Sequence, residues 1–92
     1  MPRYLMERTV GDATRDELQA VAARSTQLRE EQFPQIRWEH THVVRTPAGM
    51  KAFCIYESPD ADTVRAHAAA VGLPAEQLFE IETDLAPPSA GN

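Results

Sequence analysis

The feature that most constrains this chain is a hydrophobic pattern that alternates between a period of two residues and a period of about 3.6. The first period predicts strands with one buried face, and the second predicts amphipathic helices. Strand patterns cover residues 3–9, 36–45, 50–57 and 78–85. Helical patterns lie between residues 14 and 34 and between residues 58 and 72. The predicted order is therefore strand, helix, strand, strand, helix, strand.

Short signals mark the ends of the two helices. Thr14, with Glu17 three residues later, forms a capping-box pattern at the start of the first helix. Ser58 or Asp60 begins the second helix, and Gly72 suits its C-terminal end because glycine accepts the left-handed conformation found there. These signals agree with the element order.

That order is typical of an α+β domain of the ferredoxin-like βαββαβ type, a four-stranded antiparallel sheet with both helices on one face. A chain of 92 residues can bury one hydrophobic core and not two. Residues 1–86 are expected to form this single ferredoxin-like domain. Residues 87–92 contain proline, serine, alanine and glycine and are expected to form a loose tail.

Composition narrows the classes of function. The net charge of −5, without any basic run, argues against binding to nucleic acid. The N-terminal MPRYLMERT carries charges where a signal peptide needs apolar residues, and no segment approaches the ~20 apolar residues of a membrane helix. Cys54 is the one cysteine, so no internal disulfide can form. We expect a cytoplasmic protein without a nucleic-acid or membrane partner.

The two faces of the predicted sheet differ in composition. Odd-numbered strand residues are aliphatic or aromatic and are expected to pack against the helices: Leu5, Val43, Phe53, Ile55, Phe79 and Ile81. Even-numbered strand residues form a mixed face: Tyr4, Met6, Arg8, Trp38, His40, His42, Cys54, Tyr56, Glu80 and Glu82. A mixed face is too apolar for water and too polar for a core. Two copies are therefore expected to meet there as a homodimer, a dimeric α+β barrel around a semi-polar cavity.

The turn between the second and third strands decides which side chains meet. Its sequence is Thr-Pro-Ala-Gly, in which proline presets the first turn position and glycine accepts a left-handed conformation. A three-residue turn over residues 47–49 would place His42 opposite Cys54 and His40 opposite Tyr56. The four side chains would then form one patch.

This patch is a candidate metal site. His40 and His42 point to the same side of a strand, roughly 7 Å apart along the chain at ~3.3 Å per residue. Cys54 and Glu80 are expected on the same face. Imidazole, carboxylate and thiolate suit nickel, zinc or copper, and nickel or zinc is the expected cofactor. The same histidines also fit ordinary hydrogen-bonded surface or interface positions, and Cys54 fits a small buried apolar residue.

Binding of a small molecule is the alternative. Trp38 and Tyr56 would form the walls of its pocket. A cofactor-independent oxygenase, isomerase or decarboxylase could use His40, His42 and Tyr56 as acid or base, although no nucleophile triad, P-loop or dinucleotide motif accompanies them. An interaction protein without chemistry of its own is a third class. His67, on the apolar stripe of the second helix, is expected to pack and to be oriented by a hydrogen bond.

Five segments spread over nearly the whole chain carry a resemblance: ERT, DELQAVAARS, PQIRWEHTHV, FCIYESPDADTVRAHA and GLPAEQLFEI. They resemble the small bacterial ferredoxin-like domains of unknown function that include a nickel-binding protein. The resemblance implies a dimeric fold and nickel bound by side chains of the domain. The positions that match the family are Trp38, His40, Cys54, Tyr56 and His67. Relatives usually carry an aromatic residue where this chain has His42.

Overall fold

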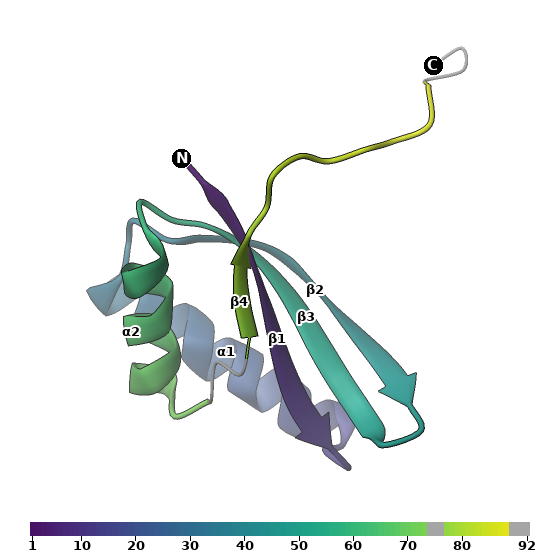
Figure 1. Ribbon diagram of the computed structural model, residues 1–92. Coiled ribbons are helices and arrows are strands. Elements are labelled where there is room, and N and C mark those ends of the chain that lie inside the picture. The colour runs from purple at the N-terminus through teal and green to yellow at the C-terminus, as the bar shows by residue number, and fades with distance from the viewer. Residues whose placement is uncertain (74–76, 89–92) are drawn as a thin grey trace.

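The computed structural model describes residues 1–73 and 77–88, and within these ranges the chain forms two helices and one four-stranded antiparallel sheet. The elements are β1 (Arg3–Gly11), α1 (Arg15–Gln32), β2 (Arg37–Thr46), β3 (Gly49–Glu57), α2 (Ala61–Val71) and β4 (Gln77–Glu80). The strands lie in the order β2-β3-β1-β4, and both helices lie on one side of the sheet (Figure 1). The expected ferredoxin-like α+β fold is confirmed.

The helix signals in the sequence form the hydrogen bonds that were expected. The Thr14 hydroxyl accepts from the Glu17 backbone N–H at 3.1 Å, and the Glu17 carboxylate accepts from the Thr14 N–H at 2.8 Å. Asp60 caps α2 by accepting from the Thr63 N–H at 2.8 Å. Gly72 follows α2 with a φ of 85°, in the left-handed region that favours glycine. Local capping therefore positions both helices.

The hairpin between β2 and β3 differs from expectation by one residue. Thr46 pairs with Gly49, so the turn has two central residues and not three. His42 consequently lies opposite Phe53 and not opposite Cys54. Side chains alternate between the two faces along a strand. A shift of β2 by one residue against β3 therefore changes which side chains of the two strands share a face.

A second irregularity lies within β2. Trp38 pairs with Tyr56, whereas His40 pairs with Ile55, so Glu39 is an extra residue in the ladder. A bulge of this kind changes the facing of every residue beyond it. Trp38 therefore lies on one face of the sheet, while His40 lies on the other.

The expected assignment of the two faces is wrong for β1, β3 and β4, whereas Val43 of β2 lies on the helix side as expected. The face covered by the helices, here called the inner face, carries buried even-numbered residues of β1 and β3: Tyr4, Met6, Arg8, Ala52, Cys54 and Tyr56. The opposite, outer face carries odd-numbered residues of β1 and β3, among them Leu5, Phe53 and Ile55. Tyrosine, methionine and cysteine can be buried in a core as aliphatic residues are. Both faces of the predicted sheet therefore carried residues that could pack against the helices.

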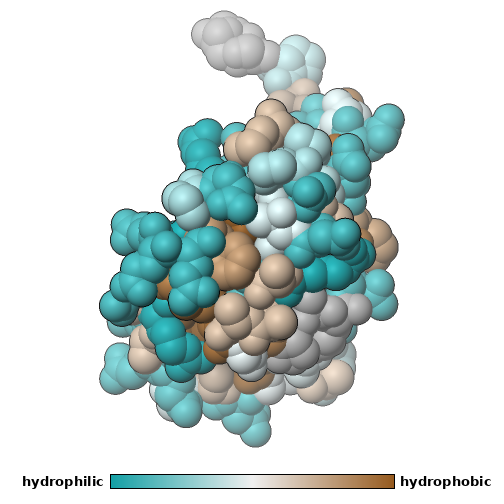
Figure 2. Space-filling model, turned by 90° about the vertical axis from the view of Figure 1, so that its left-hand side faces the viewer, coloured by the Kyte–Doolittle hydropathy of each residue, from teal (hydrophilic) through white to brown (hydrophobic). Residues whose placement is uncertain are grey.

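Helix α2 contributes the stripe predicted for it, because Val64, His67, Ala68 and Val71 are its buried residues. Val64 and Ala68 pack in one cluster with Met6, which is 0 % exposed. On the side of the molecule near α2, hydrophilic residues surround a band of apolar surface (Figure 2). Of the helices that the structure describes, neither is long and apolar enough to cross a membrane.

The last strand is shorter than the expected range of 78–85. After β4, the backbone N–H of Ile81 continues the pairing by donating to the Arg3 carbonyl at 2.8 Å. The chain from there to residue 88 runs away from the sheet (Figure 1). Of the expected tail at 87–92, residues 89–92 lie outside the described residues.

Candidate functional site

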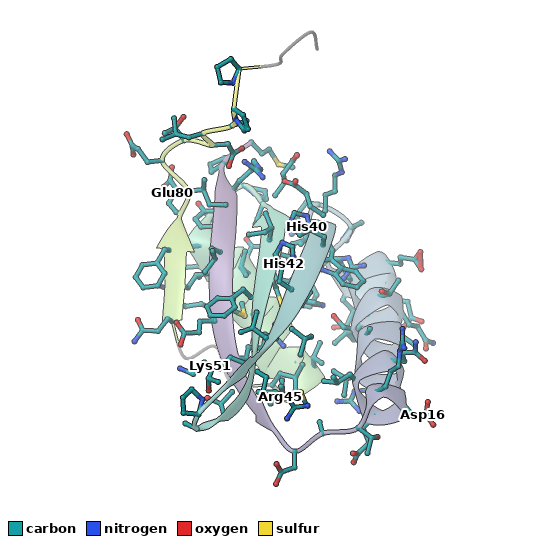
Figure 3. All side chains as sticks on the ribbon, turned by 90° about the vertical axis from the view of Figure 1, so that its right-hand side faces the viewer. Asp16, His40, His42, Arg45, Lys51 and Glu80 are labelled. Carbon is teal, nitrogen blue, oxygen red and sulfur yellow. The ribbon has the colours of Figure 1, made fainter. Side chains whose placement is uncertain are left out.

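The outer face carries the two strand histidines. His40 and His42 are both exposed, and their ring centroids lie 4.8 Å apart with the ring planes at 70°. Figure 3 shows the two side chains next to each other on β2. Because both lie beyond the bulge at Glu39, they share the outer face with Phe53 and Ile55. Two imidazoles at this spacing can approach a common ion.

The other expected metal ligands lie elsewhere. Cys54 is buried on the inner face, opposite Met6 of β1, so the sheet separates it from both histidines. Glu80 belongs to β4, at the opposite edge of the sheet from β2 (Figure 3). Among the described residues, no group of three or more His, Cys, Asp or Glu side chains could hold a metal ion. The expected set of His40, His42, Cys54 and Glu80 therefore does not meet at one point within one chain.

The histidines and Tyr56 are also separated. Tyr56 pairs with Trp38 on the inner face, before the bulge reverses the facing of β2. An acid–base constellation of His40, His42 and Tyr56 cannot act on one molecule bound to one chain, because the sheet lies between them.

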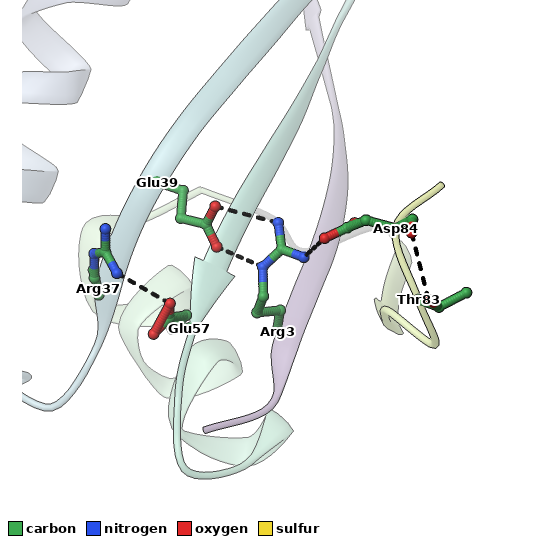
Figure 4. Close-up of polar contacts among 6 residues, drawn as sticks. All are labelled: Arg3, Arg37, Glu39, Glu57, Thr83 and Asp84. Carbon is green, nitrogen blue, oxygen red and sulfur yellow. Dashed lines mark hydrogen bonds and ion pairs between the residues drawn. The ribbon is translucent and has the colours of Figure 1, made fainter. Parts of the chain in front are cut away.

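Charged residues on the outer face are paired across strands. The Arg3 guanidinium donates to the Glu39 carboxylate at 2.6 Å and also contacts Asp84 (Figure 4). Arg37 pairs with Glu57 at 3.2 Å, and Lys51 pairs with Glu7 at 2.7 Å. The hydrogen bonds from Arg3 lower the pKa of Glu39 below its usual value. The bulged residue is thus held by an ion pair that crosses the sheet.

A cavity of about 900 Å³ lies between α1 and the inner face. Its walls include Trp38, Tyr56 and Cys54 from the sheet and Leu18, Val21 and Ala22 from α1. Trp38 and Tyr56, the expected pocket walls, therefore do line a cavity within a single chain. The Trp38 indole N–H donates to the Thr41 hydroxyl at 2.9 Å, which fixes the ring against that wall. This cavity is a second candidate site, on the other side of the sheet from the histidines.

Two buried arginines lie near this cavity, and sequence reasoning did not single out either as a binding residue. Arg8 lines the cavity and is 6 % exposed, with one guanidinium nitrogen 3.4 Å from the Tyr56 hydroxyl and another 3.1 Å from the Met6 sulfur. The Arg29 guanidinium lies over the Trp38 ring, 5.5 Å from its centroid. Burial raises the pKa of Tyr56 to about 12. Tyr56 therefore remains a neutral hydroxyl.

His67 is the buried histidine of the fold, and its environment agrees with the expected packing role. The side chain is 1 % exposed, and its Nε2–H donates to the Ser25 carbonyl at 3.2 Å, which joins α2 to α1. The ring also meets Phe33 edge to face, with centroids 5.4 Å apart. Burial lowers the pKa of His67, with a smaller contribution in the same direction from Arg29 and Arg8. The ring is therefore neutral at neutral pH.

Comparison with known families shows which family this chain belongs to. A family model described as "Nickel responsive protein SCO4226-like" matches residues 4–81. The chain belongs to this family. Except for Arg3, the match covers all four strands and both helices, which agrees with the resemblance seen in the sequence segments.

A solved structure supports the fold of this SCO4226-like chain. The crystal structure of SCO4226 from Streptomyces coelicolor A3(2) aligns with a TM-score of 0.73 and 17 % sequence identity, over 90 % of this chain and 99 % of that one. At this level of identity the likeness concerns the fold alone. No curated protein matches the chain.

Proposed function

We propose that this SCO4226-like protein binds a divalent transition metal through His40 and His42 on the outer face of the sheet. Nickel is the metal that the proposal favours. The observation that carries the proposal is the adjacency of the two exposed imidazoles, with ring centroids 4.8 Å apart. Membership in a family described as nickel responsive supports nickel as the first metal to test. Neutral imidazole is a common ligand for nickel, zinc and copper.

Two histidines alone are an incomplete ligand set, and a second copy of the chain can complete it. If two outer faces meet across a two-fold axis near β2, each copy contributes its own histidine pair. Four imidazoles, with or without water, then surround one ion. We therefore expect about one metal ion for every two chains.

The composition of the outer face supports this dimer. Phe79 is 53 % exposed there and Val44 is 38 % exposed, and Leu5 and Phe53 lie between them on the central strands. Such apolar side chains gain free energy when a partner covers them. The charged residues around them are already paired across strands, which lowers the cost of removing them from water. Dimerisation through the outer face is thus part of the proposal.

Titration calorimetry of tag-free protein with nickel and with zinc, at about pH 7.5, tests the metal site. The His40→Ala, His42→Ala double variant should lose binding. Arg45→Ala, which removes another exposed side chain of β2, is the matched control and should bind as the unmodified protein does. Full binding by the double variant, or no binding by the unmodified protein, would contradict the proposal.

Sedimentation velocity tests the dimer separately. Phe53→Asp places a charge at the centre of the outer face and should give monomers. Ala69→Asp adds the same charge on the exposed side of α2 and should leave the assembly intact. If the unmodified protein is monomeric at micromolar concentration, or if Phe53→Asp still forms dimers, the outer faces do not meet. The proposal that two copies share the metal ligands would then be contradicted.

A further inference from the structure

Helix α1 packs loosely on the sheet. Its apolar stripe includes Leu18, Val21 and Ala22, and all three remain partly exposed, because they face the cavity and not a filled core. Of the residues of α1, all of which the structure describes, Arg29 is the buried one. The cavity volume, about 900 Å³, lies within the range of small-molecule sites, which extends from roughly 300 to 1,000 Å³.

Among the described residues, no ion pair balances the charge of Arg8. A guanidinium stays protonated in proteins, and burying it without an anion costs free energy. No carboxylate among residues 1–73 and 77–88 forms an ion pair with Arg8, which donates to the Met6 thioether and the Tyr56 phenol. Glu17 also lines the cavity, but its carboxylate accepts the capping hydrogen bond of α1. The cavity therefore offers a cation that forms no ion pair with the described residues.

Arg29 provides an independent observation of the same kind. It is 9 % exposed, one of its terminal nitrogens donates to the Thr26 hydroxyl at 3.1 Å, and the other is buried and has no hydrogen-bond partner among the described residues. Its guanidinium lies against Trp38, a wall of the cavity. Two buried guanidinium groups thus lie near Trp38 and Tyr56, in a protein whose net charge is −5. Their positive potential inside the domain favours an anion.

We propose that the cavity between α1 and the sheet binds a small organic anion, a monocarboxylate with an apolar body. The carboxylate accepts hydrogen bonds from Arg8 and from the Tyr56 hydroxyl. The apolar body lies against Trp38 and the α1 stripe of Leu18, Val21 and Ala22. Inorganic phosphate would satisfy the charge but would leave these apolar walls uncovered, so a carboxylate with a hydrocarbon body fits the lining better.

Charge at the entrance supports the same ligand class. Arg15 at the start of α1 and Arg45 at the end of β2 are exposed and line the cavity. Exposed arginines beside a cavity raise the local concentration of anions and speed their entry. The site lies on the face of the sheet opposite His40 and His42, so it is independent of the metal proposal.

Titration calorimetry with decanoate, and in parallel with uncharged 1-decanol, tests this site. Decanoate should bind the unmodified protein, and decanol should bind more weakly. Arg8→Met keeps a similar length of side chain without the charge and should weaken decanoate binding about tenfold or more, since charge-assisted hydrogen bonds are lost. Arg65→Met, on the exposed side of α2, is the control and should have no effect.

A second variant keeps the test decisive if Arg8→Met does not fold. Ala22→Phe places a ring in the cavity from a partly exposed position of α1 and should abolish decanoate binding while the helices remain. Decanoate should still bind the His40→Ala, His42→Ala variant, which separates this proposal from the metal site. Unchanged decanoate affinity in Arg8→Met or in Ala22→Phe, or no binding by the unmodified protein, would overturn the proposal.

Discussion

The two faces of the sheet treat charge in opposite ways. On the outer face, which is open to water, Arg3 and Lys51 pair with carboxylates of neighbouring strands. On the inner face, where burial makes an unpaired charge costly, Arg8 contacts only neutral groups of the described residues. The outer face is electrostatically complete and fits a flat surface such as a second copy. The inner face is incomplete and fits a small ligand that carries the missing charge.

The largest change in the free energy of unfolding should come from truncating an apolar side chain on the inner face, compared with its neighbour on the outer face. Met6→Ala removes a side chain that is 0 % exposed on the inner face and should lower the free energy of unfolding by about 2–5 kcal/mol. Leu5→Ala, its neighbour on the outer face, should cost clearly less in the monomer. Urea denaturation of both variants at low protein concentration measures the difference.

Protein concentration sharpens the same comparison. If a second copy covers the outer face, association adds to the apparent stability of the unmodified protein as its concentration rises. The difference in unfolding free energy between the unmodified protein and Leu5→Ala should therefore grow when both are measured at higher concentration. The Met6→Ala deficit should not change with concentration. Equal losses for both variants at low concentration would mean that the two faces are covered alike.

A smaller effect distinguishes the buried histidine from the exposed pair by pH. The pKa of His67 is lowered in the fold by burial, so the unfolded chain takes up a proton at a pH where the native ring does not. The contribution of the neutral His67 ring to the free energy of unfolding is fully present above about pH 6.5 and is lost as the pH falls below that value. His67→Gln should cost about 1–2 kcal/mol at neutral pH and flatten this loss. His42→Gln, at an exposed position, should keep it, and thermal unfolding from pH 7.5 to about pH 5 measures both.

The smallest effect should come from the ion pair that holds the bulge. The pKa of Glu39 is lowered by the hydrogen bonds from Arg3, so its contribution is present above about pH 4.3 and is lost as pH falls through the lowered value. Glu39→Gln should remove this acid-dependent part, at a pH clearly below the one for His67. Glu30→Gln, on the exposed side of α1, is the control. Thermal unfolding that follows one pH curve in both variants would show that the pair contributes nothing.

The element order, the caps and the stripe of α2 could be predicted because each depends on a few neighbouring residues. Thr14 with Glu17, and Asp60 before α2, bring their own hydrogen-bond partners. Gly72 brings the backbone freedom that a helix end needs. These local signals give the order βαββαβ, and the order gives the fold.

The facing of β2 relative to β3 could not be predicted, because it depends on single-residue shifts that composition does not reveal. One shift is the two-residue turn between Thr46 and Gly49, and the other is the extra residue at Glu39. Each reverses which side chains share a face. The pair His40 and His42 stayed together, since no shift lies between them, while Cys54 was lost from their face.

The buried arginines were missed for a different reason. Arginine is mostly exposed in proteins, so Arg29 near a helix end suggests an ordinary surface residue, and Arg8 was expected on a mixed face covered by a second copy. Their burial depends on how α1 rests on the sheet, which no local pattern contains. A strand of alternating Tyr4, Met6 and Arg8 was the available signal, because it set a charged residue in line with two that belong in the core.

The two-residue turn between Thr46 and Gly49 also limits how this chain can be compared with its relatives. A relative with the same His-x-His pattern but a three-residue turn would pair these histidines with the positions of Cys54 and Tyr56, and both imidazoles would point toward the cavity in place of solvent. A sequence alignment would score the two chains as carrying the same motif. Whether the proposed metal site extends to a relative should therefore be judged by the length of the turn between β2 and β3, and not by the histidines alone.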